Sequence, residues 1–596
     1  MKSLGLVFLF LAMNVYAQKP GPTASEAQEF MNKAEAQLAD LNVKVNRATW
    51  VQENFITDDT EAMAADAIDE VAAVTGELVE QARRFEGLAL SPELARKFML
   101  LKLSLTAPAP KDAALRREMT EIGVSLSGDY GKGKYCRKNG ECLDITAIEK
   151  LMSSSRDPEE LKEVWAGWHA IAPPMRQRYS RFVDLSNQGA REIGFKDTGA
   201  LWRSGYDVTP EEFSADLERL WDKVKPLYLS LHTFVRWKLA EKYGPKLVPP
   251  EGPIPAHLLG NPWAQEWGNV YDLLGVQEDK GGGVNITELL KKKNLDAKGM
   301  VKYGEGFFTS MGFAPLPQTF WERSLFTKPA DRDVVCHASA WDIDSFDDLR
   351  VKMCIQVRDT DFVTIHHELG HNFYQRAYKD QPFLFKNGAN DGFHEAIGDA
   401  IALAITPEYL HKVGLLESVP EASNDIPELL KQALDRVAFL PFGLMIDQWR
   451  WKVFSGEIAP ADYNKSWWEL RLKYQGVAPP VARSEGDFDP AAKYHVAANV
   501  PYTRYFLAFI LEFQFYRALC RESGYKGPLH GCTFYGSKEA GAKFNKVLAM
   551  GQSKPWPDAL EALTGGRQID ASAILEYFAP LQKWLDAQNA GKKVGW

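Results

Sequence analysis

The stretch His367-Glu368-Leu369-Gly370-His371 places two histidines four residues apart, with a glutamate beside the first. On a helix, residues four apart project from the same face, so both rings can reach one metal ion. Histidine nitrogens ligate zinc, and the neighbouring carboxylate can take the proton of a zinc-activated water that attacks a carbonyl. The alternative is a pair of surface or core histidines without a metal. The spacing favours zinc bound by His367 and His371, with Glu368 as general base.

A catalytic zinc needs a third protein ligand and an open position. The segment 394–399 (HEAIGD) follows a glycine-rich loop and has helical character, and it offers Glu395. Asp399 lies four residues on, on the same helical face, where it can accept the free ring N–H of a ligand histidine. The alternative is a helix with solvated acids. We expect Glu395 to be the third ligand and Asp399 to be the outer partner of a ligand histidine.

Composition indicates a globular, mostly helical protein. The chain has 596 residues, of which 45% are hydrophobic and 25% charged, and a net charge of −9 predicts no nucleic-acid partner. Helical spacing recurs along the chain, first from Phe30 to Val45. The best strand candidate is the alternation at 351, 353, 355 and 357. No linker is long enough to divide the chain, and the oligomeric state is not readable.

The first residues predict export from the cytoplasm. Lys2, an apolar run over 4–13 and a small-x-small site at 15–17 are typical of a secretory signal peptide cut after Ala17. The alternative is an uncleaved anchor, but the run is short for a membrane span. No later apolar segment approaches the length of a membrane-spanning helix. We expect a mature chain of residues 18–596 that is secreted or periplasmic and has no membrane anchor.

The six cysteines fall into neighbouring pairs. An even number of cysteines in an exported chain predicts disulfides, and free buried thiols are the alternative. The pairs are Cys136 with Cys142, Cys336 with Cys354, and Cys520 with Cys532.

Beyond these motifs, the sequence resembles the angiotensin-converting enzyme family, the peptidyl-dipeptidase family of zinc peptidases. The likeness covers 366–371 with 392–399 and extends from about Cys136 to the C-terminus. Further family-like blocks are 253–261 (PIPAHLLGN), 335–342 (VCHASAWD), 447–451 (DQWRW), 471–476 (RLKYQG), 486–490 (GDFDP) and 500–502 (VPY). The three cysteine pairs also stand where the family has its disulfides.

The resemblance implies a large helical ellipsoid of the gluzincin type, with few short strands. It implies one catalytic domain over 18–596, with two helical subdomains around a deep central cleft and N-terminal helices partly covering its opening. One zinc ion per chain lies at the floor of that cleft. The implied reaction is release of a dipeptide from the free C-terminus of an oligopeptide.

The resemblance also assigns residues on the substrate side. His495 and Tyr505 match the pair that stabilises the tetrahedral oxyanion. His337 and Ala338 match residues that hold the substrate backbone. From the residues alone, a structural role is favoured for His495, whereas a structural and a binding role are equally compatible with His337.

A clamp for the terminal carboxylate is implied by Gln265, Lys493 and Tyr502. An amide, an ammonium and a phenol supply hydrogen-bond donors around one anion. The family's monocarboxypeptidase branch has arginine at the position of Gln265, so glutamine favours dipeptide release.

Chloride is the second ion that the resemblance implies, as an activator. Tyr206 and Arg504 match one chloride site. Trp467 and Arg471 match part of another, but His169 stands where an arginine is expected, and a mostly neutral histidine holds an anion less well. We therefore expect one strong chloride site, at Tyr206 and Arg504.

Two other functions are compatible with the scaffold. One is a carboxypeptidase that releases single residues. The other is a binding protein without catalysis, although every ligand and base position is filled.

Overall fold

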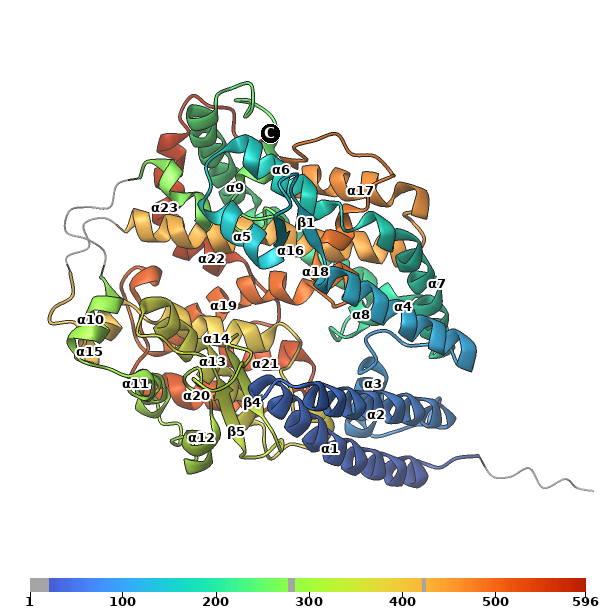
Figure 1. Ribbon diagram of the computed structural model, residues 1–596. Helices are drawn as coiled ribbons and strands as arrows, with labels where there is room; N and C mark the ends of the chain where they lie inside the picture. The colour runs from blue at the N-terminus through green and yellow to red at the C-terminus, as the bar shows by residue number, and fades with distance from the viewer. Residues whose placement is uncertain (1–20, 277–283, 421–424) are drawn as a thin grey trace, which may run out of the picture.

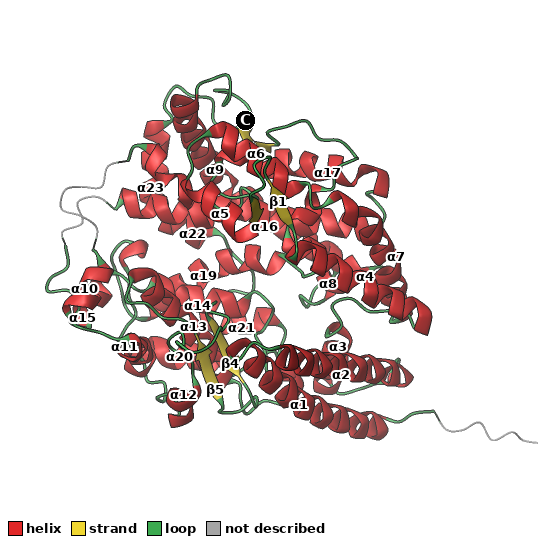
Figure 2. Cartoon of the chain, viewed as in Figure 1, coloured by secondary structure: helices red, strands yellow, loops and turns green. Residues whose placement is uncertain are grey.

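The computed structural model describes residues 21–276, 284–420 and 425–596, and the expectation of a mainly helical fold is confirmed (Figures 1 and 2). The predicted signal peptide, residues 1–17, lies outside the described residues. The helices are α1 (Ala24–Asn54), α2 (Asp58–Ala82), α3 (Pro92–Leu103), α4 (Ala113–Gly131), α5 (Ile145–Ser154), α6 (Pro158–His169), α7 (Arg176–Glu192), α8 (Thr198–Ser204), α9 (Pro210–Tyr243), α10 (Ile286–Lys292), α11 (Ala297–Ser310), α12 (Gln318–Arg323), α13 (Asp359–Ala377), α14 (Phe393–Leu403), α15 (Pro407–Lys412), α16 (Ile426–Phe454), α17 (Tyr463–Leu470), α18 (Tyr494–Ala497), α19 (Thr503–Glu522), α20 (Lys538–Leu548), α21 (Trp556–Thr564), α22 (Ser572–Tyr577) and α23 (Ala579–Gln588).

The strands are short and form three separate pairs within the described residues. They are β1 (Lys134–Cys136) with β2 (Cys142–Asp144), β3 (Ile254–Pro255) with β6 (Val477–Ala478), and β4 (Ser339–Asp342) with β5 (Leu349–Lys352). The strand expected over 351–357 was placed too far along the chain, because β5 ends at Lys352. After β5 the alternation continues, with Met353 and Ile355 buried. Their backbone N–H groups donate hydrogen bonds to the carbonyls of Leu325 and Phe326, respectively.

The N-terminal helices have a hydrophobic core of their own. The apolar residues Phe30, Ala34 and Leu38 of α1 are buried at helical spacing, and they pack with residues of α2 and α3 such as Leu78 and Leu101. Figure 1 shows α1 and α2 side by side along one flank of the molecule. A larger cluster fills the rest of the described chain.

The crossing of α13 and α14 fixes the geometry of the site. A Cβ atom on Gly370 of α13 would lie 2.8 Å from the Cα of Gly398 of α14. A Cβ on Gly398 would lie 2.8 Å from Nδ1 of His367. The backbones can approach this closely because both residues at the crossing are glycines. The close approach brings His367 against α14.

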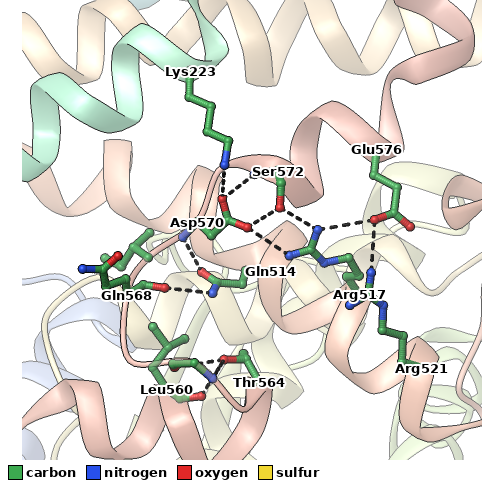
Figure 3. Close-up of polar contacts among 12 residues, drawn as sticks. Lys223, Gln514, Arg517, Arg521, Leu560, Thr564, Gln568, Asp570, Ser572 and Glu576 are labelled. Atoms are coloured by element: carbon green, nitrogen blue, oxygen red, sulfur yellow. Dashed lines mark hydrogen bonds and ion pairs between the residues drawn. The ribbon is translucent and has the colours of Figure 1, made fainter.

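Helix α19 packs on α14 and is fastened at its C-terminal half. Figure 3 shows Asp570 between Lys223 of α9 and Arg517 of α19, at 2.5 and 3.4 Å. Gln514 accepts a hydrogen bond from the backbone N–H of Asp570 at 3.0 Å and donates one to the carbonyl of Gln568 at 3.2 Å. Tyr505 lies in the first turn of α19, at the opposite end of the helix from these contacts.

All six cysteines are paired as predicted, Cys136 with Cys142, Cys336 with Cys354, and Cys520 with Cys532. Among the described residues, no helix is both long and apolar enough to cross a membrane.

Candidate metal centre and peptide-binding site

His367, His371 and Glu395 converge where α13 crosses α14. One ligand atom from each lies within 4.8 Å of the others. Nε2 of His367 lies 3.0 Å from Nε2 of His371 and 3.5 Å from Oε2 of Glu395. A tetrahedral zinc ion with its usual bond lengths separates its ligands by about 3.4 Å, so the spacing fits that ion. The Glu395 side chain is 40% exposed, which leaves the cluster open on one side.

Each histidine of the cluster has an outer partner on α14. Nδ1 of His367 lies 3.1 Å from Oδ1 of Asp399, as the sequence predicts. Nδ1 of His371 lies 3.3 Å from Nδ1 of His394, whose Nε2 lies 3.2 Å from the hydroxyl of Tyr378. When both ligand rings donate through Nδ1, both Nε2 lone pairs face one point. Two lone pairs at 3.0 Å repel unless a cation separates them, so this donor arrangement fits a metal.

His394 is a site residue that the sequence analysis missed. It stands directly before Glu395, so a close reading of the motif offered a signal. Arg436 of α16 and Glu512 of α19 were also missed. Arg436 lies 3.9 Å from Oδ2 of Asp399 and forms a tight ion pair with Glu512, which is fully buried. These residues come from distant parts of the chain and carry no local motif.

Glu368 lies beside the cluster with 7% of its surface exposed. Burial raises the pKa of its carboxyl, and the backbone of Ala340 in β4 opposes that shift through a hydrogen bond. A raised pKa suits a group that accepts a proton and later returns it near neutral pH. The geometry is therefore compatible with the general-base role.

The segment carrying His337 and Ala338 is anchored to the N-terminal helix. The ammonium of Lys352 donates to the carbonyls of Val335 and His337 at 2.8 and 2.9 Å and pairs with Glu53 of α1 at 2.8 Å. His337 itself is exposed, and its Nδ1 lies 2.9 Å from the Ala338 carbonyl. The α1 helix thus supports the edge that leads into β4.

Gln265, Lys493 and Tyr502 meet at one place, as predicted. The Lys493 ammonium donates to Oε1 of Gln265 at 2.6 Å, and the Tyr502 hydroxyl lies 3.5 Å from the same oxygen. Lys493 is 6% exposed and lies 4.0 Å from the ring centre of Trp263. Burial lowers the pKa of Lys493 to about 8. An ammonium held without a close carboxylate partner is suited to binding an anion.

His495 and Tyr505 also face each other, with Nε2 of His495 3.4 Å from the Tyr505 hydroxyl. Burial, with the charge of Lys493, lowers the pKa of His495 to about 3, so its ring is neutral at pH 7. The ring of Tyr502, a clamp residue, contacts both members of this pair: its centroid lies 4.7 Å from that of His495 and 4.9 Å from that of Tyr505.

Asp447 of α16 positions this group, a role that the sequence analysis did not assign. Its Oδ2 accepts the backbone N–H groups of Tyr502 and Thr503, each at 2.7 Å, and the Thr503 hydroxyl at 2.9 Å. Its Oδ1 pairs with the buried Arg450, which donates to the His495 carbonyl at 2.8 Å. One buried carboxylate therefore caps α19 and links Tyr502 to the segment of His495.

The two predicted anion sites differ in charge balance. Beside Tyr206, Nε of Arg504 lies 3.3 Å from Oδ2 of Asp391, an ion-pair contact without a hydrogen bond at that Nε. Arg471 is buried, donates to the Trp263 carbonyl at 2.9 Å, and has an Nε without a hydrogen-bond partner. Burial lowers the pKa of Arg471 to about 9.

His169 lies stacked on Trp165 at 3.7 Å, and burial lowers its pKa to about 4. The neutral ring at this position adds no positive charge to that of Arg471. Trp467 is buried, with 2% of its surface exposed.

Comparison with known proteins identifies the family of this chain. A family model described as angiotensin-converting enzyme matches residues 22–596. The chain therefore belongs to the angiotensin-converting enzyme family.

The chain is similar to curated angiotensin-converting enzymes of several animals. It is 42% identical to that of Rattus norvegicus over 96% of this chain and 44% of the relative's length. It is 41% identical to that of Theromyzon tessulatum, over 96% of this chain and 95% of the relative. For Haematobia irritans exigua the identity is 38%, over 95% of each. The chain thus spans a little under half the length of the rat relative and nearly all of the two invertebrate ones.

Proposed function

We propose that this chain is a zinc-dependent peptidase that releases dipeptides from the free C-terminus of oligopeptides. The observation that carries the proposal is the cluster of His367, His371 and Glu395 beside the buried Glu368. Membership of the angiotensin-converting enzyme family supports it. Bound zinc would supply a Lewis acid that polarises the scissile carbonyl and lowers the pKa of a water molecule.

The protein's own groups would then carry the proton and the charge. Glu368 takes the proton of the attacking water and afterwards gives it to the leaving amine. His495 and Tyr505 donate hydrogen bonds to the oxygen that becomes negative, and each such donor commonly lowers the barrier by about 3 kcal/mol. The His495 ring, which burial keeps neutral, retains one N–H, and the proposed role requires the tautomer that carries it at Nε2.

Substrate length would be set by the carboxylate clamp. The ammonium of Lys493 pairs with the terminal carboxylate, and Tyr502 and Gln265 contribute a phenol and an amide. An arginine at position 265 would reach further into the pocket than glutamine does. Gln265 therefore supports release of two residues rather than one. His337 and the main chain of Ala338 are proposed to hold the substrate backbone.

The decisive experiment combines a variant with product analysis. The wild-type chain, with zinc bound, is expected to cut an N-terminally blocked tripeptide into a blocked amino acid and a dipeptide. Glu368→Gln is expected to bind zinc at the same stoichiometry and to lose activity by at least about a thousandfold. Glu288→Gln, which removes an exposed carboxylate of α10, is the matched control.

Two outcomes would contradict the proposal. Undiminished cleavage by Glu368→Gln would refute the role of the base. A single amino acid as first product would identify a single-residue carboxypeptidase, and binding of peptides without any cleavage would identify a binding protein.

We also propose that chloride acts beside Arg471 and Trp467. The buried Arg471 guanidinium with its unpaired Nε supports an anion there. The ion would offset the cost of a charge held away from water.

For the chain as a whole, we propose removal of residues 1–17 on export to the periplasm or the exterior, and one catalytic domain over 18–596. Intact-mass analysis of the exported protein tests the cleavage after Ala17. A mass that includes these residues would refute it.

A further inference from the structure

The contacts of Arg504 disagree with the anion site expected at this residue. Arg504 is the second residue of α19, and Tyr206 lies near the start of α9. Both are turned toward Asp391, in the loop that precedes α14. Nε of Arg504 lies 3.3 Å from Oδ2 of Asp391. The Tyr206 hydroxyl and the same carboxylate shift each other's pKa, with burial the larger cause for both.

Backbone packing holds Asp391 in this place. A Cβ atom on the next residue, Gly392, would lie 3.3 Å from the Arg504 carbonyl oxygen and 3.2 Å from Cβ of Leu507. The loop therefore lies directly on the first turn of α19. The N–H of Gly392 is also bonded to Oδ1 of Asn390 at 3.0 Å, which fixes the turn.

The charges around Arg504 are already balanced. Asp447, the other nearby carboxylate, pairs with Arg450, and both side chains are buried. Two guanidinium groups thus face two carboxylates. A chloride ion beside Arg504 would meet the negative charge of Asp391 at close range, and like charges at close range repel although each of the two side chains is 33% exposed. The residues at this site do not fit chloride.

From this arrangement we infer that the Asp391 carboxylate is a built-in anion that replaces chloride at the Tyr206 and Arg504 site. The bridge it forms joins three elements. Asp391 lies four residues before Glu395 of the metal cluster, Arg504 lies next to Tyr505, and Tyr206 comes from the segment before α9. The anion that links the metal ligand to the oxyanion donor is then a side chain of the protein, so the link does not require bound chloride.

A thermal unfolding experiment tests the inference without measuring catalysis. The unfolding midpoint is followed while chloride replaces gluconate at constant ionic strength. Asp391→Asn keeps the shape and removes the negative charge that would repel chloride beside Arg504. Its midpoint is expected to rise with chloride more steeply than that of the wild type, because a ligand that binds only the folded chain stabilises it. Any response common to all variants reports other sites.

Two controls separate charge from shape. Asp331→Asn removes a carboxylate whose side chain is 78% exposed, and it is expected to follow the wild type. Asp391→Glu keeps the charge and is expected to show no added chloride response. Equal chloride slopes for Asp391→Asn and the wild type would overturn the inference.

A second measurement needs no variant and covers the case in which Asp391→Asn does not fold. Crystals of the wild-type protein grown with bromide in place of chloride are examined by anomalous scattering. No bromide is expected within contact distance of Arg504, and a bromide there would overturn the inference.

An activity measurement extends the test and is the only part that rests on the proposed function. Cleavage of the blocked tripeptide by Asp391→Asn is expected to rise about tenfold with chloride, in the range typical of coupling between two sites. The wild type is expected to lack this added activation. If the chain proves not to cleave peptides, the thermal and bromide results still decide the inference.

Discussion

Removal of the Asp399 side chain should weaken zinc binding without unfolding the protein. Asp399 accepts the Nδ1–H of His367 at 3.1 Å, and its side chain is 18% exposed. It fixes the tautomer that points the Nε2 lone pair at the metal, and it raises the basicity of the ring. Arg436 retains its partner Glu512 in the variant, so the buried cation is not left unpaired.

The magnitude follows from the loss of one charge-assisted contact to a ligand histidine. Loss of such an outer partner typically lowers metal affinity by about 10- to 100-fold, which is about 1.4 to 2.7 kcal/mol. Asp399→Ala should fall near the upper end of this range. Asp399→Asn keeps an oxygen acceptor but not the charge, so about a tenfold loss is expected.

The assay is competition for zinc between the protein and a chelator of known affinity, with circular dichroism to confirm the fold. Asp359→Asn, at the exposed start of α13, the helix that carries His367, controls for the change in net charge. A zinc dissociation constant of Asp399→Ala within about threefold of the wild type would refute the reasoning, because Asp399 would then not orient the ligand.

Two further predictions concern the substrate clamp and the disulfides. Because burial lowers the pKa of Lys493 to about 8, the ammonium is charged below that pH and loses its proton as pH rises through it. The ratio of kcat/KM for a free-acid substrate to that for its C-terminal amide should therefore fall above about pH 8 by up to about tenfold per pH unit; a ratio that stays constant to pH 10 would contradict the clamp. Serine at both positions of the pair Cys336 and Cys354, 18 residues apart, should lower the free energy of unfolding by about 3 kcal/mol, against about 2 kcal/mol for Cys136 and Cys142, six residues apart. Denaturant unfolding measures both, and the opposite order would show that loop length does not govern these bridges.

Much of the metal centre could be predicted from the sequence, because its information is local. The four-residue spacing of His367 and His371 fixes their common face as soon as a helix forms. The same holds for Glu395 and Asp399, whose separation is again one helical turn. Helical periodicity also predicted the buried positions Phe30, Ala34, Leu38 and Leu41 of α1 correctly, whereas Val45 is only half-buried. The clamp and the oxyanion pair carry no such spacing, and they were predicted from family-like blocks alone.

What the sequence could not give are contacts between groups from distant segments. Asp447 accepts hydrogen bonds from the backbone of Tyr502 and Thr503, which follow it by 55 and 56 positions. Asp399 lies near Arg436 and Glu512, which belong to two other helices. Asp391 was read only as part of a loop, yet the tertiary structure sets it beside Arg504, more than 100 residues later. The ion pair at that arginine is the reason why we propose chloride at the other predicted anion site.

The sequence by itself thus determined which residues can ligate zinc, because side-chain direction on a helix depends on spacing alone. Only the tertiary structure decided which charges are already paired, because ion pairing depends on the few ångströms that separate side chains after the helices have packed. Gly370 and Gly398 depend on both the sequence and the packing. The sequence places a glycine at each position, and the packed structure uses both to set the closest approach of the two helices that carry the metal ligands.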